Sequence, residues 1–208
     1  MGLYSKYVLP KLVHYACSSE HNMAQRGRVV PMAKGQVLEV GIGSGLNLPY
    51  YDPLQVEKVW GLDPSNELRQ MAAREAEKVD MEVELLAERG EEIPLDANSV
   101  DTVLTTFTLC TIADAEQALA SMARVLKPGG TFLFCEHGVA PDASVRRMQN
   151  GLNPIWKRVG GGCHLNRPIP HLIEENGFEI TALKARYMPG WRWASFHYWG
   201  AATTAEGS

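Results

Sequence analysis

The stretch VLEVGIGSGLN, residues Val37 to Asn47, indicates the fold of this chain. It places three glycines within five residues directly after an apolar run, and Glu39 stands two positions before the first of them. Each glycine loses more conformational entropy on folding than an alanine would, so this cluster needs a structural reason. The usual reason is a turn after a β-strand, where backbone N–H groups approach a nucleotide without a Cβ in the way.

The spacing of the glycines distinguishes between classes of nucleotide. A P-loop needs a lysine after its glycines, and none follows here. A dinucleotide fingerprint, G-x-G-x-x-G, begins correctly at Gly41 and Gly43, but the third glycine comes one residue early, at Gly45. Glu39 would repel a pyrophosphate, whereas it suits a cationic ligand such as S-adenosylmethionine (SAM), with its amino group and sulfonium. A dinucleotide-dependent oxidoreductase is the alternative.

Asp63 is the second part of the same pattern. It ends the apolar segment Lys58–Asp63, about 20 residues after Gly41, where an acid accepts hydrogen bonds from both ribose hydroxyls. A plain tight turn and an unrelated capping aspartate would also explain these residues. The order of strand, glycine frame and acid favours a nucleoside site.

Apolar runs alternate with helical patterns along the rest of the chain, as in a parallel α/β sheet. The segments EITALKARY and WASFHYWGAAT, near the C-terminus, alternate apolar and polar residues and indicate a final antiparallel pair. Helices are expected after Asp63, after Asp114 and before Gly177, with Ser65 and Asp114 as N-caps. Earlier strands are expected at Gln36–Val40, Lys58–Asp63, Glu82–Ala87, from Val100 onward, and at Thr131–His137.

Composition limits the classes of function. The chain has 208 residues, an apolar share of 45% and a formal charge of −4, so broad nucleic-acid binding is not expected. Its four cysteines form no C-x-x-C pair, which favours a reduced, cytoplasmic setting. No run of 18 apolar residues predicts a membrane-spanning helix. The N-terminal segment, interrupted by Pro10, is a poor signal peptide; it is expected to lie on the protein, with peripheral membrane contact as the alternative.

Together, these motifs resemble the class I SAM-dependent methyltransferases. VLEVGIGSG resembles their first motif, GLD the acid that ends their second strand, and RVLKPGG the helix and turn before their fifth strand. The resemblance implies an α/β, Rossmann-like fold with a seven-stranded, mostly parallel sheet, helices on both faces and an antiparallel last strand. It implies one domain, 1–208, with an N-terminal helical lid at 1–30, a SAM-binding core at 36–136 and a substrate-side insertion at 138–167.

The resemblance also implies which residues hold SAM and its product, S-adenosylhomocysteine. The glycines would line the methionine and ribose part, Asp63 would hold the ribose, and Thr105–Phe107 would face the methionine end. Arg89 stands where the family often has an acid, so backbone groups of the turn Glu88–Gly90 would supply the adenine contact. The expected cofactor-binding residues are Glu39, Gly41, Gly43, Gly45, Asn47, Asp63, Pro64, Arg89, Gly90, Glu91, Thr105, Thr106 and Phe107.

A narrower resemblance covers nearly the whole chain. TLCTI, EHG and the pattern N-P-x-W … G-G-C-H-L-x-R, which ends at Arg167, are similar to a methyltransferase-like group that includes mammalian thiol S-methyltransferases and many uncharacterised bacterial proteins. It implies a small, apolar acceptor with a thiol as the leading class. Ionising a thiol at pH 7 costs only about 2 kcal/mol, so a modest base suffices. The alternatives are a quinone, lipid or phenolic acceptor, and a non-catalytic SAM-binding protein.

Three residues are candidates for the chemistry: His137, His164 and Arg167. His137 follows the fifth expected strand, where acceptor and SAM meet in this fold; it is either a general base or a histidine bonded to the backbone. Cys163 and His164 are adjacent, and adjacent residues chelate one ion poorly, so no metal is expected.

The N-terminal segment has a helical spacing of its own. Tyr4, Tyr7, Val8 and Leu12 lie three and four residues apart. We expect them to lie across the cofactor as a lid that excludes water. The oligomeric state is left open by the sequence.

Overall fold

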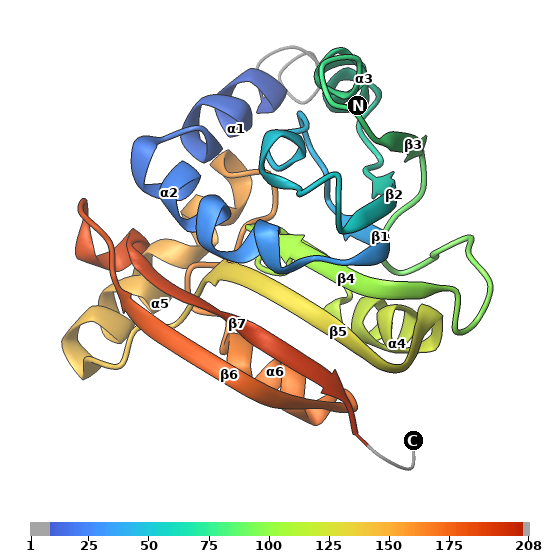
Figure 1. Ribbon diagram of the computed structural model, residues 1–208. Helices are drawn as coiled ribbons and strands as arrows, with labels where there is room; N and C mark the ends of the chain where they lie inside the picture. Colours follow the sequence, from blue (N-terminus) through green and yellow to red (C-terminus); the bar gives the residue numbers. More distant parts are fainter. Residues whose placement is uncertain (1–8, 206–208) are drawn as a thin grey trace.

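The computed structural model describes residues 9–205. A twisted sheet of seven strands forms the centre of this described part (Figure 1), in the order β3-β2-β1-β4-β5-β7-β6. Strands β1 to β5 pair parallel with one another, and β7 runs antiparallel to both β5 and β6. The expected seven-stranded, mostly parallel sheet is therefore confirmed. Its strands are β1 (Gly35–Val40), β2 (Val56–Leu62), β3 (Glu82–Leu86), β4 (Val100–Thr106), β5 (Leu126–His137), β6 (Phe178–Tyr187) and β7 (Phe196–Thr204).

The strand order reverses between β1 and β4. The chain builds outward from β1 through β2 to β3 and then returns to place β4 on the other side of β1. In open α/β sheets, ligands bind in the crevice outside the carboxyl ends of the strands at such a switch point. The glycine turn after Val40 and the segment after Thr106 both lie at this crevice because they directly follow β1 and β4.

Helices cover both faces of the sheet, as expected. Buried side chains of α4 and α6 pack with Leu38, Val103 and Phe132 on one face. Val29 of α2 and Ala76 of α3 pack with Val37 and its neighbours on the other. The helices are α1 (Leu9–Cys17), α2 (Glu20–Val29), α3 (Asn66–Ala76), α4 (Ala115–Val125), α5 (Ala143–Val159) and α6 (Ile169–Glu175), with short 3-10 turns at Val30–Met32, Leu48–Tyr50 and Arg192–Ala194.

Local sequence signals account for two of these helices. Ser65 accepts a hydrogen bond from the Leu68 N–H at the start of α3, and Asp114 accepts one from Gln117 N–H at the start of α4, as their N-cap positions predict. The segment RVLKPGG was expected to form the end of a helix and a turn before a strand at Thr131–His137, but α4 ends at Val125 and β5 begins at Leu126. Strand pairing between Val100 and Leu126 begins at once and draws the chain into β5.

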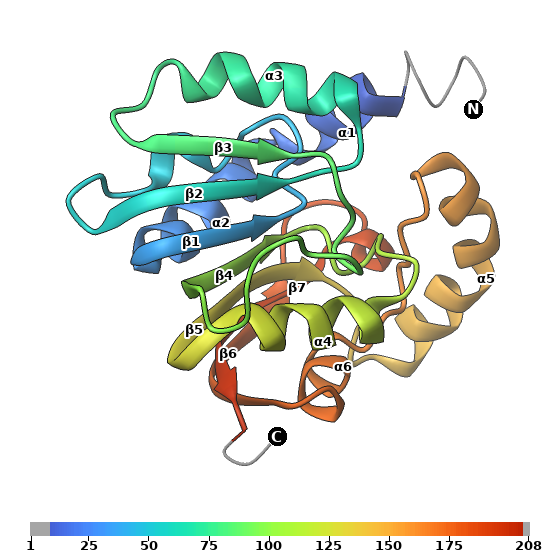
Figure 2. The same ribbon diagram turned by 90° about the vertical axis from the view of Figure 1, so that its right-hand side faces the viewer.

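The segment 138–167, expected only as an insertion, contains the 17-residue helix α5. Figure 2 shows α5 beyond the arrowheads of β1, β2 and β3. Buried Gln149 fixes this helix to the protein: it accepts from Ala140 N–H at 2.9 Å and donates to the carbonyl of Leu165 at 2.9 Å. Helical periodicity was hidden here by Pro154, which lies inside the helix. None of the helices in residues 9–205 combines the length and the apolar character needed to cross a lipid bilayer.

Candidate functional site

The glycine turn after β1 divides into packing and ligand-facing positions. Gly41, Gly43 and Gly45 have φ angles of 76°, 56° and 81°, a region that side chains with a Cβ rarely adopt. A Cβ on Gly41 would lie 2.3 Å from the Thr108 side chain, and one on Gly45 would lie 3.1 Å from the backbone of Ala72 in α3. Among residues 9–205, a Cβ on Gly43 would meet nothing closer than 3.9 Å. Gly43 is thus a pocket-lining glycine with open space where a side chain would stand.

A pocket of about 500 Å³ lies at the switch point, a size typical of sites for small molecules. Residues from the ends of β1, β2 and β4 form its walls, together with α1, α2 and the loop after α5. Most of the residues expected to bind a cofactor line this pocket: Gly41, Gly43, Asp63, Pro64, Arg89, Gly90, Glu91, Thr106 and Phe107. Four others lie behind its wall or within the core: Glu39, Gly45, Asn47 and Thr105.

Asp63 connects the two halves of the crevice. Its carboxylate accepts hydrogen bonds from the backbone N–H groups of Gly43, at 3.1 Å, and Ser65, at 2.8 Å. Burial raises the pKa of this carboxyl, and the two hydrogen bonds act in the opposite direction. The end of β2 is therefore tied to the glycine turn, with an acid at the pocket wall.

Glu39 occupies a different place from the one expected. Its carboxylate accepts hydrogen bonds from Tyr51 Oη at 2.7 Å and from Asn47 Nδ2 at 2.8 Å, and its side chain is buried. Burial raises its pKa to about 7, although both hydrogen bonds and the charge of Arg26 act to lower it. Glu39 therefore supports the wall through Asn47 and does not face the pocket.

Arg26, on α2, is a pocket residue that was not among the site residues expected from the sequence. It lines the pocket although its exposed fraction is only 4%. One guanidinium nitrogen donates at 2.6 Å to both Asn47 Oδ1 and Thr106 Oγ1, and the guanidinium lies 5.3 Å from the centre of the Phe107 ring. Its Nε has no hydrogen-bond partner among the described residues. No local motif marked this residue, because only the folding of α2 against the sheet brings it here.

Helix α1 closes the pocket from another side. Pro10, Val13, His14 and Cys17 line the pocket, and His14 Nδ1 lies 2.7 Å from Ser44 Oγ in the glycine turn. Of the residues expected to form a lid, Leu12 is 48% exposed and does not line the pocket. The positions of Tyr4, Tyr7 and Val8 lie outside the described residues.

The segment after β4 is strained where it meets the pocket. Phe107 has a φ of 56°, which is uncommon for a residue with a bulky side chain and typical of functional sites. Its N–H donates to the carbonyl of Cys135 at 2.8 Å, and the buried carboxylate of Glu136 accepts from the N–H groups of Thr108 and Leu109. These bonds hold the strained turn in place.

The three candidates for the chemistry surround the pocket without lining it. Arg167 donates to the carbonyls of Leu109 and Ile112, and its other nitrogen lies 3.3 Å from His164 Nδ1. His164 Nδ1 also lies 3.1 Å from the carbonyl oxygen of Cys110. Arg167 therefore braces the loop that contributes Thr111 and Ile112 to the pocket.

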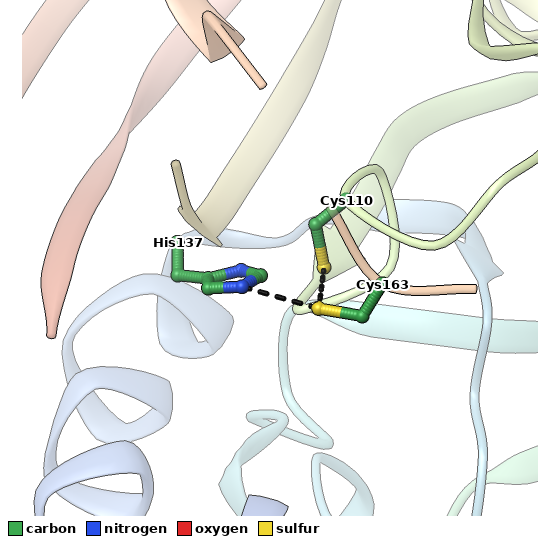
Figure 3. Close-up of side chains that lie close together, drawn as sticks. All are labelled: Cys110, His137 and Cys163. Carbon is green, nitrogen blue, oxygen red and sulfur yellow. Dashed lines mark hydrogen bonds between the residues drawn. The ribbon is translucent and has the colours of Figure 1, made fainter. Parts of the chain in front are cut away.

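His137 makes a hydrogen-bond contact with a thiol. It was expected to be either a general base or a histidine hydrogen-bonded to the backbone, and neither expectation included this contact. Its Nε2 lies 3.1 Å from Cys163 Sγ, which in turn lies 3.7 Å from Cys110 Sγ (Figure 3). The spacing of these residues along the chain gave no sign of the cluster, because α4 and β5 lie between Cys110 and His137, and α5 lies between His137 and Cys163.

Comparisons with known proteins agree with this geometry. A family model described as "Methyltransferase domain" matches residues 38–134. Thiol S-methyltransferase TMT1B of Rattus norvegicus is 34% identical over 161 residues, which are 76% of this chain and 65% of that protein. Thiol S-methyltransferase TMT1A of Homo sapiens is 33% identical over 178 residues, 83% of this chain and 72% of that protein.

Solved structures share the fold. A SAM-dependent methyltransferase from Thermotoga maritima aligns with a TM-score of 0.65 at 20% identity, over 98% of this chain and 96% of its own. At this level of identity the likeness shows the fold alone.

Proposed function

We propose that this chain, which belongs to the class I SAM-dependent methyltransferases, transfers the methyl group of SAM to a small, apolar acceptor, with a thiol as the leading class. SAM is the cofactor, and it supplies a methyl group already activated by its sulfonium. The contribution left to the protein is alignment of the acceptor and exclusion of water. The observation that carries the proposal is the pocket at the switch point, whose wall contains the glycine turn and, hydrogen-bonded to it, Asp63.

The residues present fit this cofactor. The open side of Gly43 leaves space where a ligand backbone can approach, and Asp63 stands where ribose hydroxyls would donate to its carboxylate. The turn Glu88–Glu91 would border the adenine. We assign the carboxylate of the methionine part to Arg26, because it lines the pocket and its guanidinium carries a positive charge, and Glu39 cannot fill an anion-binding role.

The opposite end of the pocket supports an acceptor that is easily deprotonated. Cys17, Thr111 and the glycines 160–162 line the pocket, as do the acids Asp63, Glu88 and Glu91. We assign the acids to the nucleoside side and the other residues to the acceptor end. An alkyl hydroxyl would need a strong, well-placed base. A thiol needs only a modest one, as its pKa is about 8.5.

His137 and His164 are the proposed proton acceptors, and Arg167 is a proposed positioning residue. Burial and the charge of Arg167 lower the pKa of His164, so its ring is neutral at pH 7 and has a lone pair to offer. His137 would have to release its contact with Cys163 to accept a proton. The pH profile of thiol methylation by His137→Ala and His164→Ala tests these roles; an unchanged profile removes the residue from the mechanism.

The function is tested by binding and then by turnover. Calorimetric titration with SAM and with NADH should give binding of SAM alone; NADH binding without SAM binding would establish the oxidoreductase alternative. A panel of thiols, phenols, amines and quinols with methyl-labelled SAM, read by mass spectrometry, should give a labelled thioether. Label on a quinol or phenol would correct the acceptor class, and SAM binding without any labelled product would indicate a non-catalytic protein.

A further inference from the structure

Three side chains with soft or borderline donor atoms converge beside the pocket. Cys110 lies in the loop after β4, His137 ends β5, and Cys163 follows α5. Figure 3 shows both sulfur atoms and the imidazole directed toward one another. Cys163 Sγ lies 3.7 Å from Cys110 Sγ and 3.1 Å from His137 Nε2, and all three donor atoms lie within 4.8 Å of one another.

The distances between these donor atoms are closer to those around a bound metal ion than to the sulfur–sulfur distance of a disulfide. A tetrahedral zinc ion, with Zn–S of about 2.3 Å and Zn–N of about 2.0 Å, holds its donors about 3.5–3.8 Å apart. The sulfur pair already has such a separation. The Cys163–His137 pair needs to open by about half an ångström, and the Cys110–His137 pair, whose donor atoms lie within 4.8 Å, needs to close by about 1.3 Å at most. A disulfide would need the sulfurs to approach to about 2 Å, and an oxidant as well.

Hydrogen bonds hold the backbone around the cluster in place without a bound ion. The N–H of His164 donates to the carbonyl of Cys110 at 2.8 Å, which joins the two cysteine-bearing loops. Arg167 donates to the carbonyls on either side of Cys110, at Leu109 and Ile112. Donors held by rigid loops lose little entropy when an ion binds, so these bonds favour a preformed site.

We propose that Cys110, His137 and Cys163 bind one Zn²⁺ ion and leave its fourth position open toward the acceptor end of the pocket. Two cysteines and a histidine with one open position form a donor set found in catalytic zinc sites. The direction of the open position follows from Thr111 and Gly162, the chain neighbours of the two cysteines, because both line the pocket.

The open position gives the site a role that rests on the proposed function. With zinc bound, His137 is a ligand and does not act as the base. An acceptor thiol would bind zinc as a thiolate and lose its proton to His164 or to solvent, because a coordinating thiol is deprotonated outright. Its sulfur would then form a bond to the methyl carbon while the bond from that carbon to the sulfonium breaks, and the bonding electron pair stays on the departing sulfur. The products are a neutral thioether, which binds zinc weakly, and S-adenosylhomocysteine.

The site is tested by metal binding, independently of turnover. Protein freed of metal by a chelator is titrated with Co²⁺, and thiolate-to-cobalt absorption is recorded; zinc content is then measured by mass spectrometry. About one ion per chain is expected for the wild type. Cys110→Ser, Cys163→Ser and His137→Ala should each weaken zinc binding by about a hundredfold or more. Cys17→Ser and His164→Ala, whose side chains lie outside the group of three, should retain it.

X-ray absorption of the zinc-loaded wild type identifies the ligands directly, so this result does not depend on whether the variants fold. Two sulfur ligands and one protein nitrogen ligand are expected. A wild type that binds no zinc below about 10 μM, or that carries a Cys110–Cys163 disulfide instead, overturns the site. Zinc binding without methylation of any thiol upholds the site and overturns the proposed acceptor. Thiol methylation at an unchanged rate by metal-free Cys163→Ser overturns the role of the ion.

Discussion

At the scale of single residues, Gly43 allows two effects of an added side chain to be told apart: strain in the backbone, and loss of space for the ligand. Its φ is 56°, yet a Cβ there would meet no neighbouring side chain. Gly177 is a matched position far along the chain, after α6, with a φ of 84° and no atom of residues 9–205 within 4 Å of such a Cβ. Both substitutions carry a similar backbone strain of about 1–2 kcal/mol.

We therefore expect Gly43→Val to abolish SAM binding, while Gly177→Val keeps the wild-type affinity. Calorimetry at a temperature at which both variants remain folded measures the difference. Equal losses in the two variants would mean that backbone strain, and not the space for the ligand, explains the effect.

Arg26 offers a second test at this scale. If its guanidinium holds the carboxylate of SAM, Arg26→Ala should weaken SAM binding by at least about tenfold, the value of one charge-assisted hydrogen bond. The loss should disappear for 5′-methylthioadenosine, which has no carboxylate. Arg28→Ala, on the exposed part of the same helix, is the control. A loss of the same size for both ligands would indicate a structural role.

Glu39 predicts a pH dependence of stability. Its pKa is raised to about 7 in the folded protein, against about 4.5 in the unfolded chain. The folded state thus holds this proton more tightly, so the contribution of Glu39 to stability is greatest below pH 4.5 and is lost as pH rises through 7. The fall is about 3 kcal/mol at most.

Glu39→Gln cannot ionise, so urea unfolding between pH 4.5 and 8 should show a smaller loss of stability for this variant than for the wild type. Glu179→Gln, at an exposed position on β6, corrects for general charge effects. Parallel stability curves for wild type and Glu39→Gln would contradict the raised pKa.

At the scale of elements, α1 contributes four residues to the wall of the pocket. The bond between His14 and Ser44 joins this helix to the glycine turn, and we propose that α1 acts as a lid through this bond. Deleting residues 1–20 should then weaken SAM binding and lower activity.

His14→Ala and Ser44→Ala should each speed SAM dissociation, and the double variant should be no faster than either single one, because both remove one interaction. Stopped-flow fluorescence measures these rates. Tyr15→Ala, which alters a side chain of α1 that is 82% exposed, is the control. Additive effects would show that the two residues act separately.

At the scale of the whole molecule, the pocket joins parts of the chain that contribute little alone: the glycine turn, the end of β4, α1, α2 and the loop after α5. A ligand that binds only the folded state should therefore stabilise the whole domain. SAM at a hundred times its dissociation constant adds about 2.7 kcal/mol, which corresponds to a rise in melting temperature of about 5–10 °C. NADH at the same concentration should cause no rise, and an equal rise with NADH would contradict the cofactor assignment.

Much of the fold could be predicted because its signals are local. The glycine frame, the acid at position 63 and the caps at Ser65 and Asp114 each depend on neighbours within a few residues, and the strand order then follows from the rules of parallel α/β sheets. The helix α5 was not predicted, since Pro154 masks its periodicity and its anchor, Gln149, bonds to groups distant in sequence.

The candidate site divides in the same way. By itself, the sequence determined the Rossmann-like sheet, the class of cofactor and the turn that faces it, because these depend on short, directional patterns. Only the tertiary structure turned Glu39 away from the pocket, brought Arg26 into it and joined Cys110, His137 and Cys163. Those positions depend on which face of a strand or helix packs inward and on contacts between segments up to 80 residues apart, and no local pattern encodes such contacts.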